Sequence, residues 1–129
     1  MNAPVVFDVD GTLTSEYYDE GNLLTLRENP TMMLLALAMQ AERPLVISTA
    51  RPEKYMDQTE QWLASHGLIP DAIFMRPSGQ ESLPDAVVKL DHLQLIRAMY
   101  CNPLVWVDDN DSNVEMLQKN KVPVIHVKQ

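Results

Sequence analysis

Two aspartates near the start of the chain, Asp8 and Asp10, follow an apolar, β-branched run and lead into an Asp-Gly pair. The run Val5–Phe7 is typical of a buried strand, and Asp-Gly is typical of a sharp turn. Both carboxylates are therefore expected close together at a strand end, where they repel each other unless a cation or a shared proton relieves them. An Asp-Gly pair alone more often marks a plain turn than a catalytic site. The rest of the chain must therefore show which of the two this segment is.

Further reactive side chains follow other predicted strands. Thr49 comes just after one apolar run, the pair Asp108 and Asp109 follows another, and Lys89 lies near the start of a predicted helix. Because parallel strands place their carboxyl ends at one edge of the sheet, we expect all of these groups in one crevice. Taken singly, Thr49 is equally consistent with a helix-capping hydroxyl and Lys89 with a surface lysine.

The predicted crevice has a definite chemistry. Oxygen ligands without histidine or cysteine favour a hard cation, above all Mg²⁺. A carboxylate beside Mg²⁺ and a lysine can attack a phosphorus atom, and a second carboxylate can protonate the leaving oxygen. The residue types therefore predict phosphoryl chemistry that depends on magnesium.

Alternating strands and helices are expected to position these groups. The strand runs are nearly continuous in apolar residues, which is typical of a parallel sheet covered on both faces. The predicted strands span residues 5–9, 45–47, 71–75, 104–107 and 122–127. The predicted helices span residues 30–40, 52–66 and 82–100, and a fourth begins at a Ser112-x-x-Glu115 capping box. Residues 31–40 are nearly all apolar, so the first helix is expected to be well buried.

The length and composition limit the possible classes of protein. A chain of 129 residues with 46% hydrophobic residues fits one packed domain over residues 1–129. Its net charge of −8 opposes non-specific nucleic-acid binding through charge alone. The single cysteine fits a reducing compartment, and no signal peptide or membrane span is evident. We therefore expect a cytoplasmic protein without a membrane association.

Four segments in order, DVDGTLT, VISTAR, VVKLDHL and VWVDDNDSNVE, resemble the signature motifs of the haloacid dehalogenase (HAD) superfamily. The resemblance covers residues 5 to about 127. It implies an α/β, Rossmann-like fold whose five-stranded parallel sheet has the order 5-4-1-2-3, with helices on both faces. It also implies Mg²⁺-dependent phosphoryl transfer. The segments between the motifs have room for one helix each, so we expect a capless protein.

The resemblance also implies roles for individual residues. Asp8 matches the nucleophile and Asp10 the general acid and then base, while Thr49 and Lys89 match the residues that hold the phosphoryl oxygens. The expected metal ligands are Asp8, the backbone carbonyl of Asp10, and Asp109. Asp108 is expected to orient water and Lys89, with direct metal binding by Asp108 as the alternative.

A narrower resemblance concerns IFMRPSG, PDAVVKL and DDNDSNVEM, which are similar to the 3′-phosphatase domains of bacteriophage polynucleotide kinase–phosphatases. It implies that substrate is bound near Arg51, Arg76 and Asp85, together with Thr12 of the first motif. Arg51 is expected to reach a phosphate or a neighbouring phosphodiester. Asp85, one helical turn before Lys89, is expected either to orient that lysine or simply to cap the helix.

Two features limit the likeness. The sequence has no Gly-Lys-Ser/Thr phosphate-binding loop of a kinase, and residues 14–21 (TSEYYDEG), a predicted flap over the strand end, are acidic. The leading hypothesis is a phosphomonoesterase that forms an aspartyl-phosphate and acts on a nucleic-acid or nucleotide 3′-phosphate. The alternatives are a small-metabolite phosphatase closed by oligomerisation, a phosphomutase-like transferase, and a catalytically silent binding module.

Overall fold

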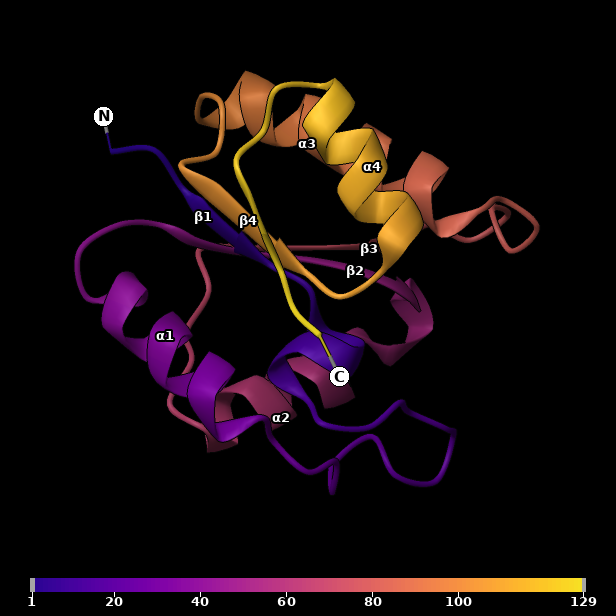
Figure 1. Cartoon of the computed structure of the whole chain (residues 1–129). Coiled ribbons are helices and arrows are strands. Elements are labelled where there is room, and N and C mark those ends of the chain that lie inside the picture. The colour runs from indigo at the N-terminus through magenta and orange to yellow at the C-terminus, as the bar shows by residue number, and fades with distance from the viewer. Residues whose placement is uncertain (1, 129) are drawn as a thin grey trace.

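The computed structural model describes residues 2–128 and has a central parallel sheet between two layers of helices (Figure 1). The strand order is β3-β2-β1-β4-β5, which is the predicted order read from the other edge. The strands are β1 (Val5–Phe7), β2 (Leu45–Pro52), β3 (Ala72–Arg76), β4 (Val105–Asp108) and β5 (Val124–His126).

Helices α1 (Pro30–Gln40) and α2 (Met56–Ser65) cover one face of the sheet, and α3 (Asp85–Met99) and α4 (Asp111–Lys119) cover the other (Figure 1). Side chains alternate along β1, so that Val5 and Phe7 join the core beneath α1 and α2, whereas Val6 joins the core beneath α3 and α4. Burial on both faces explains the uninterrupted apolar strand sequences.

Several predicted boundaries are wrong. The first strand ends at Phe7 rather than residue 9, because Val9–Leu13 forms a wide turn with non-helical backbone at Asp10 and Gly11. The turn is closed by a hydrogen bond from the Thr14 N–H to the Val9 carbonyl oxygen. The second strand continues to Pro52, and a short 3₁₀ turn, Glu53–Tyr55, precedes α2. The end of β2 is polar, so the apolar pattern of the sequence could not reveal it. Pairing of β2 with β3 is irregular after Ser48 and resumes at Pro52.

Two predicted helix starts also need correction. Asn110, rather than Ser112, caps α4, and its side chain accepts from the backbone N–H of Asn113 at 3.0 Å. Pro84 precedes α3, and Ser82 lies outside the helix. In both cases the helix begins at a residue other than the one the capping-box pattern requires.

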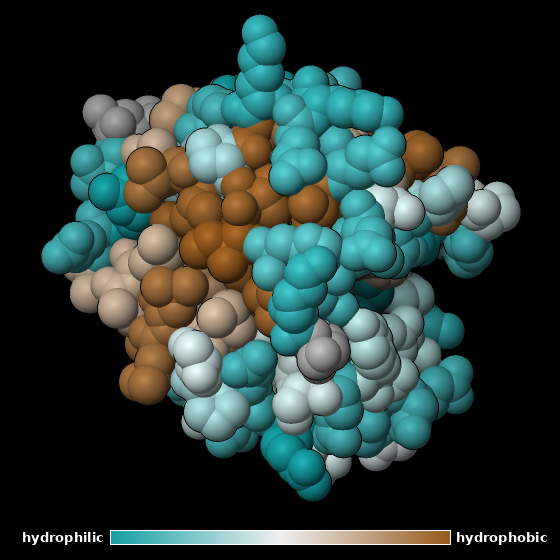
Figure 2. Space-filling view, in the orientation of Figure 1, coloured by the Kyte–Doolittle hydropathy of each residue, from teal (hydrophilic) through white to brown (hydrophobic). Residues whose placement is uncertain are grey.

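Helix α1 is less buried than its composition predicts. Met33 and Ala36 are its buried residues, while 68% of Leu34 is exposed. The helix packs against one face of the sheet, so its other side meets solvent. Figure 2 shows further apolar atoms at the surface of the molecule, and Leu104 and Ile125 are among the exposed apolar residues. No helix within residues 2–128 is long and apolar enough to cross a membrane.

Candidate active site

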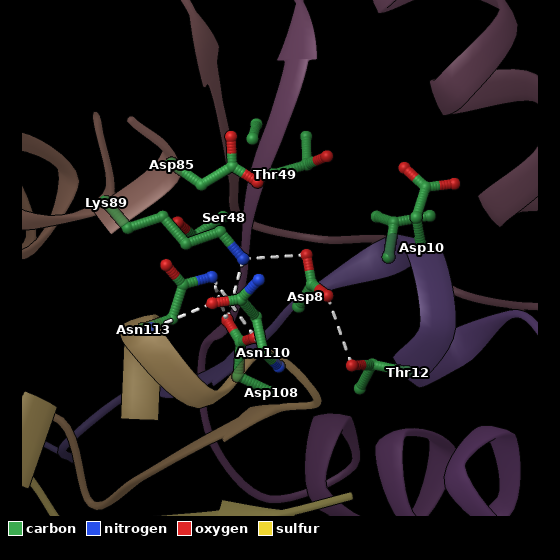
Figure 3. Close-up of polar contacts among 12 residues, drawn as sticks. Asp8, Asp10, Thr12, Ser48, Thr49, Asp85, Lys89, Asp108, Asn110 and Asn113 are labelled. Carbon is green, nitrogen blue, oxygen red and sulfur yellow. Dashed lines mark hydrogen bonds and ion pairs between the residues drawn. The ribbon is translucent and has the colours of Figure 1, made fainter. Parts of the chain in front are cut away.

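The three central strands deliver the predicted residues to one place. Val5 of β1 pairs with Leu45 of β2 and Val105 of β4, so the strands run in register towards their carboxyl ends. Asp8 directly follows β1, Thr49 lies in β2 and Asp108 ends β4. The crevice predicted from the strand ends therefore exists, and Figure 3 shows Asp8, Asp108 and Lys89 converging in it.

Lys89 joins the two carboxylates at the floor of the site. Its Nζ donates to Asp8 Oδ1 and to Asp108 Oδ2, each at 2.7 Å, and all three side chains are buried (Figure 3). The interpretation of Lys89 as a surface lysine is wrong. Burial lowers the pKa of Lys89, but the two carboxylates outweigh this effect and raise it above its ordinary value.

Burial also changes the Asp8 carboxyl. It raises the pKa of Asp8 well above its ordinary value, against the opposing effect of Lys89. The nearby Asp108 carboxylate adds to the increase. A further cation beside Asp8 would therefore favour the ionised form that a nucleophile needs.

Asp108 and Asp109 have different surroundings. Asp108 is fully buried, and its Oδ1 accepts from the backbone N–H of Asn110 at 3.0 Å and from Asn113 Nδ2 at 3.3 Å. Asp109 lines the cavity described below and accepts a hydrogen bond from the Tyr17 hydroxyl. That bond is the main cause that raises the pKa of Tyr17 to about 12.

Asp10 lies opposite this cluster and is held by Arg51. The guanidinium donates from Nε to Asp10 Oδ2 and from Nη2 to Asp10 Oδ1, both at 2.8 Å, and from Nη1 to Thr59 at 3.0 Å. Arg51 is 1% exposed, and the central carbon of its guanidinium lies 5.1 Å from the centroid of the Tyr18 ring. Arg51 thus positions the predicted acid–base residue in this structure, and its contact with substrate stays a prediction.

Arg76 and Asp85 form a second pair at the cavity wall. Arg76 Nη2 donates to Asp85 Oδ1 at 2.6 Å. The remaining guanidinium nitrogens donate to the carbonyl oxygens of Ala50, Gln80 and Leu83. Asp85 therefore pairs with Arg76, and the prediction that it orients Lys89 has no support in the hydrogen bonds of the site.

The two threonines take different places. Thr12 is fully buried, and its hydroxyl lies 3.2 Å from Asp8 Oδ2 and 3.4 Å from Asp109 Oδ1. The Thr12 hydroxyl thus lies between the Asp8 and Asp109 carboxylates. Substrate binding by Thr12 stays a prediction. Thr49 lines the cavity, and its hydroxyl accepts from the backbone N–H of Arg51 at 3.2 Å within β2, so it does not cap the following helix as the alternative proposed.

A cavity of about 380 Å³ connects these groups. Its wall also includes five polar residues that sequence reasoning did not single out: Tyr17, Tyr18, Glu81, Asn110 and Asn113. A pair of adjacent tyrosines in an otherwise polar loop was the available signal for the first two. The asparagines showed no comparable pattern, because Asn110 is recognisable as a cap only once the start of α4 is known.

The carboxylates fit a hard cation. Asp8, Asp108 and Asp109 each offer an oxygen atom, and the three atoms lie within 4.8 Å of one another. Asn113 is buried at the cavity wall, and its Oδ1 has no hydrogen-bond partner among the described residues, so it can accept from a water molecule there. Both features match a site for Mg²⁺, which keeps several water ligands.

Structural comparison finds the same fold in other proteins of solved structure. A chain of the "Structure of the Pnkp1/Rnl/Hen1 RNA repair complex" superposes with a TM-score of 0.85 at 22% identity, over 97% of this chain and 42% of that one. A second chain, from the "Structure of Pnkp1/Rnl/Hen1 complex", superposes with a TM-score of 0.81 at 20% identity. The match covers 97% of this chain and 45% of that one. The present chain thus spans less than half the length of these two.

A more distant match is a putative β-phosphoglucomutase from Thermotoga maritima, with a TM-score of 0.64 at 15% identity over 99% of this chain and 88% of that one. A comparison with curated proteins gave no significant match. The family model described as the polynucleotide kinase PNKP phosphatase domain, in contrast, matches residues 2–129. The chain therefore belongs to the PNKP phosphatase domain family and is a phosphatase of the HAD superfamily.

Proposed function

We propose that this phosphatase is a Mg²⁺-dependent phosphomonoester hydrolase that works through an aspartyl-phosphate on Asp8. The substrate class we propose is a 3′-phosphate on a nucleic-acid end or a nucleotide. The observation that carries the proposal is the Asp8 carboxylate at the cavity wall, held by the buried Lys89 and adjacent to Asp109. The family match supports the nucleic-acid part of the proposal.

In the first half-reaction an Asp8 oxygen bonds to phosphorus, and the bond from phosphorus to the leaving oxygen breaks. Asp10 gives its proton to that oxygen. Thr49 and Lys89 hold the phosphoryl oxygens. In the second half-reaction water bonds to phosphorus and passes a proton to Asp10, and the bond to Asp8 breaks, which releases inorganic phosphate and restores both aspartates.

We assign the cation to Asp8, Asp109 and the backbone carbonyl of Asp10. When bound, Mg²⁺ supplies positive charge that offsets the phosphoryl and carboxylate charges. Asp108 is the poorer candidate for a direct ligand, because it is fully buried and does not line the cavity, whereas Asp8 and Asp109 do. Its proposed task is to fix Lys89.

The test is phosphate release with Mg²⁺ from a 3′-phosphorylated oligonucleotide and from matching 3′- and 5′-mononucleotides. We expect turnover of the 3′-phosphates by the wild type and none above background by Asp8→Asn, which keeps the shape of the side chain but removes the nucleophile. Circular dichroism would verify that the variant is folded. Turnover by a folded Asp8→Asn protein would exclude the covalent route.

A small-metabolite phosphatase closed by oligomerisation is the second candidate, favoured by the open site of a capless chain. Activity on small sugar phosphates but on no nucleotide, from an oligomer, would establish it instead.

A further inference from the structure

The cationic side chains that line the cavity are already paired. Within the described residues these are Arg51, Arg76 and Lys89. Arg51 binds both oxygens of Asp10, and Arg76 binds Asp85 and three backbone carbonyls. Lys89 lies between Asp8 and Asp108. The floor can hold one phosphoryl group through Lys89 and a bound cation, but neither guanidinium is available for a second phosphate.

The rim of the cavity is acidic. The flap (residues 14–21) contains Glu16, Asp19 and Glu20 but no lysine or arginine, and these three side chains are exposed. Glu20 lies beside the cavity wall, since its carboxylate is 3.3 Å from the hydroxyl of Tyr55, whose ring contacts the cavity-lining Tyr18. Glu81 lines the cavity from the other side and is exposed. The exposed Lys54 also lies here, with its Nζ 5.1 Å from the centroid of the Tyr55 ring, but the carboxylates outnumber it. A polyanionic chain crossing this rim would therefore be repelled more than attracted.

Among the described residues of the cavity wall, Tyr17 offers an exposed aromatic ring. Tyr17 is 63% exposed, although its hydroxyl is anchored on Asp109. Tyr18, by contrast, is packed between Arg51 and Tyr55. Aromatic rings held by one end beside a phosphate site are suited to stack a nucleobase, and stacking does not depend on charge.

We propose that the site recognises the terminal nucleoside alone. The ring of Tyr17 stacks on its base while Asp8 and Lys89 engage its phosphomonoester, and the preceding phosphodiesters make no attractive contact. This inference rests on the proposed 3′-phosphatase function and specifies its substrate class. Single nucleotides and polynucleotide ends are then equivalent substrates.

The first experiment varies length and salt with the wild-type protein. We expect kcat/KM for a 3′-phosphorylated ten-nucleotide strand to stay within about threefold of the value for the 3′-mononucleotide, and to change by less than about threefold between 50 and 200 mM salt. A gain of tenfold or more with length, lost as salt rises, would show phosphodiester contacts and overturn the inference.

The second experiment tests Tyr17 with two variants and two substrates. Tyr17→Leu removes the aromatic ring and keeps an apolar side chain, whereas Tyr17→Phe keeps the ring and removes the hydroxyl. The readout is the ratio of kcat/KM for a nucleoside 3′-phosphate to that for the same sugar phosphate without a base. We expect Tyr17→Leu to lower this ratio about tenfold, and Tyr17→Phe, which keeps the ring but loses its hydrogen bond to Asp109, to lower it much less.

The two levels of the proposal fail differently. If nucleotides are hydrolysed but Tyr17→Leu leaves the ratio unchanged, Tyr17 does not recognise the base, and the 3′-phosphatase function stands. If the wild type hydrolyses the base-free sugar phosphate and no nucleotide, the proposed function fails, and the inference fails with it.

Discussion

Asp108 and Asp109 are neighbours in the chain with opposite surroundings. The Asp108 carboxylate is fully buried and binds Lys89, whereas the Asp109 carboxylate lies at the cavity wall. Since successive side chains of an extended segment point in opposite directions, one residue can secure the lysine while the next faces the substrate. This division of roles separates two variants experimentally.

Asp109→Asn is expected to raise the Mg²⁺ concentration needed for half-maximal activity at least tenfold, because an amide is a weaker ligand for a hard cation. Its free energy of unfolding should change little. Asp108→Asn should instead lower that free energy by about 3 kcal/mol, because it breaks a buried ion pair. Magnesium titration and urea unfolding of both variants measure the two effects, and the reverse pattern would exchange the roles.

Asp10 is assigned the proton transfer to the leaving oxygen. Asp10→Asn should therefore slow hydrolysis of a substrate with a poor, basic leaving group by about 10²–10⁴-fold, and slow a substrate with a good leaving group much less. Steady-state rates on alkyl and nitrophenyl phosphates give the comparison. Equal losses on both would assign Asp10 to positioning alone, a task consistent with its two hydrogen bonds to Arg51.

At the scale of elements, the turn after β1 brings the Asp10 region close to β4. Gly11 adopts a φ of +79°, and a Cβ there would collide with the Asp109 carboxylate and lie 2.7 Å from the Tyr17 hydroxyl oxygen. This turn therefore requires glycine for two reasons, the backbone conformation and the lack of space.

Gly79 provides a matched control, because its φ is +91° and a Cβ there would have no atom within 4 Å. Gly79→Ala should lower the free energy of unfolding by about 1 kcal/mol, because alanine is strained at this positive φ but meets no neighbouring atom. Gly11→Ala should cost more and should also weaken activation by Mg²⁺, because Asp109 must move. Similar stability and similar magnesium titrations for the two variants would contradict the proposed crowding.

His92 joins three elements behind the site. Its Nδ1 lies 2.7 Å from the Ser48 hydroxyl of β2, and its Nε2 lies 2.9 Å from the carbonyl oxygen of Met75 in β3. Since a carbonyl only accepts, Nε2 carries the proton, and Nδ1 accepts from Ser48. Burial lowers the pKa of His92 to about 4.

The unfolded chain therefore binds a proton at His92 that the folded protein does not, between pH 6.5 and 4, and stability falls as the pH falls through this range. From pH 7 to pH 5 the contribution of His92 is a loss of about 2 kcal/mol. His92→Gln should lose that much less than the wild type on the same acidification, as measured by urea unfolding. Equal losses would mean that His92 is not held neutral.

At the scale of the whole molecule, the site lies at an open edge of a three-layer fold. The described residues form one sheet with its covering helices, and no separate cap lies over the carboxyl ends of the strands (Figure 1). Water can therefore reach the Asp8 carboxylate, whereas a phosphomutase needs water to be excluded from its phosphorylated residue.

We expect hydrolysis to exceed phosphoryl transfer even when a sugar acceptor is abundant. Phosphorus NMR of a reaction with excess sugar or sugar phosphate should show inorganic phosphate as the main product. Predominant transfer to the acceptor would favour a phosphomutase-like transferase instead.

The sequence by itself determined the fold class and the strand-end residues that meet at one edge of the sheet. The β-branched runs specified strands, and parallel strands necessarily bring Asp8, Thr49 and Asp108 to the same edge. These results follow from local periodicity and one topological rule, so no long-range information was required.

Only the tertiary structure decided what each side chain binds. Arg51 binds Asp10, and Asp85 binds Arg76, across separations of 41 and 9 residues. Similarly, Tyr17 reaches Asp109 across 92 residues. Such contacts depend on how loops and helix ends pack above the sheet, and no periodic pattern in the chain records that packing.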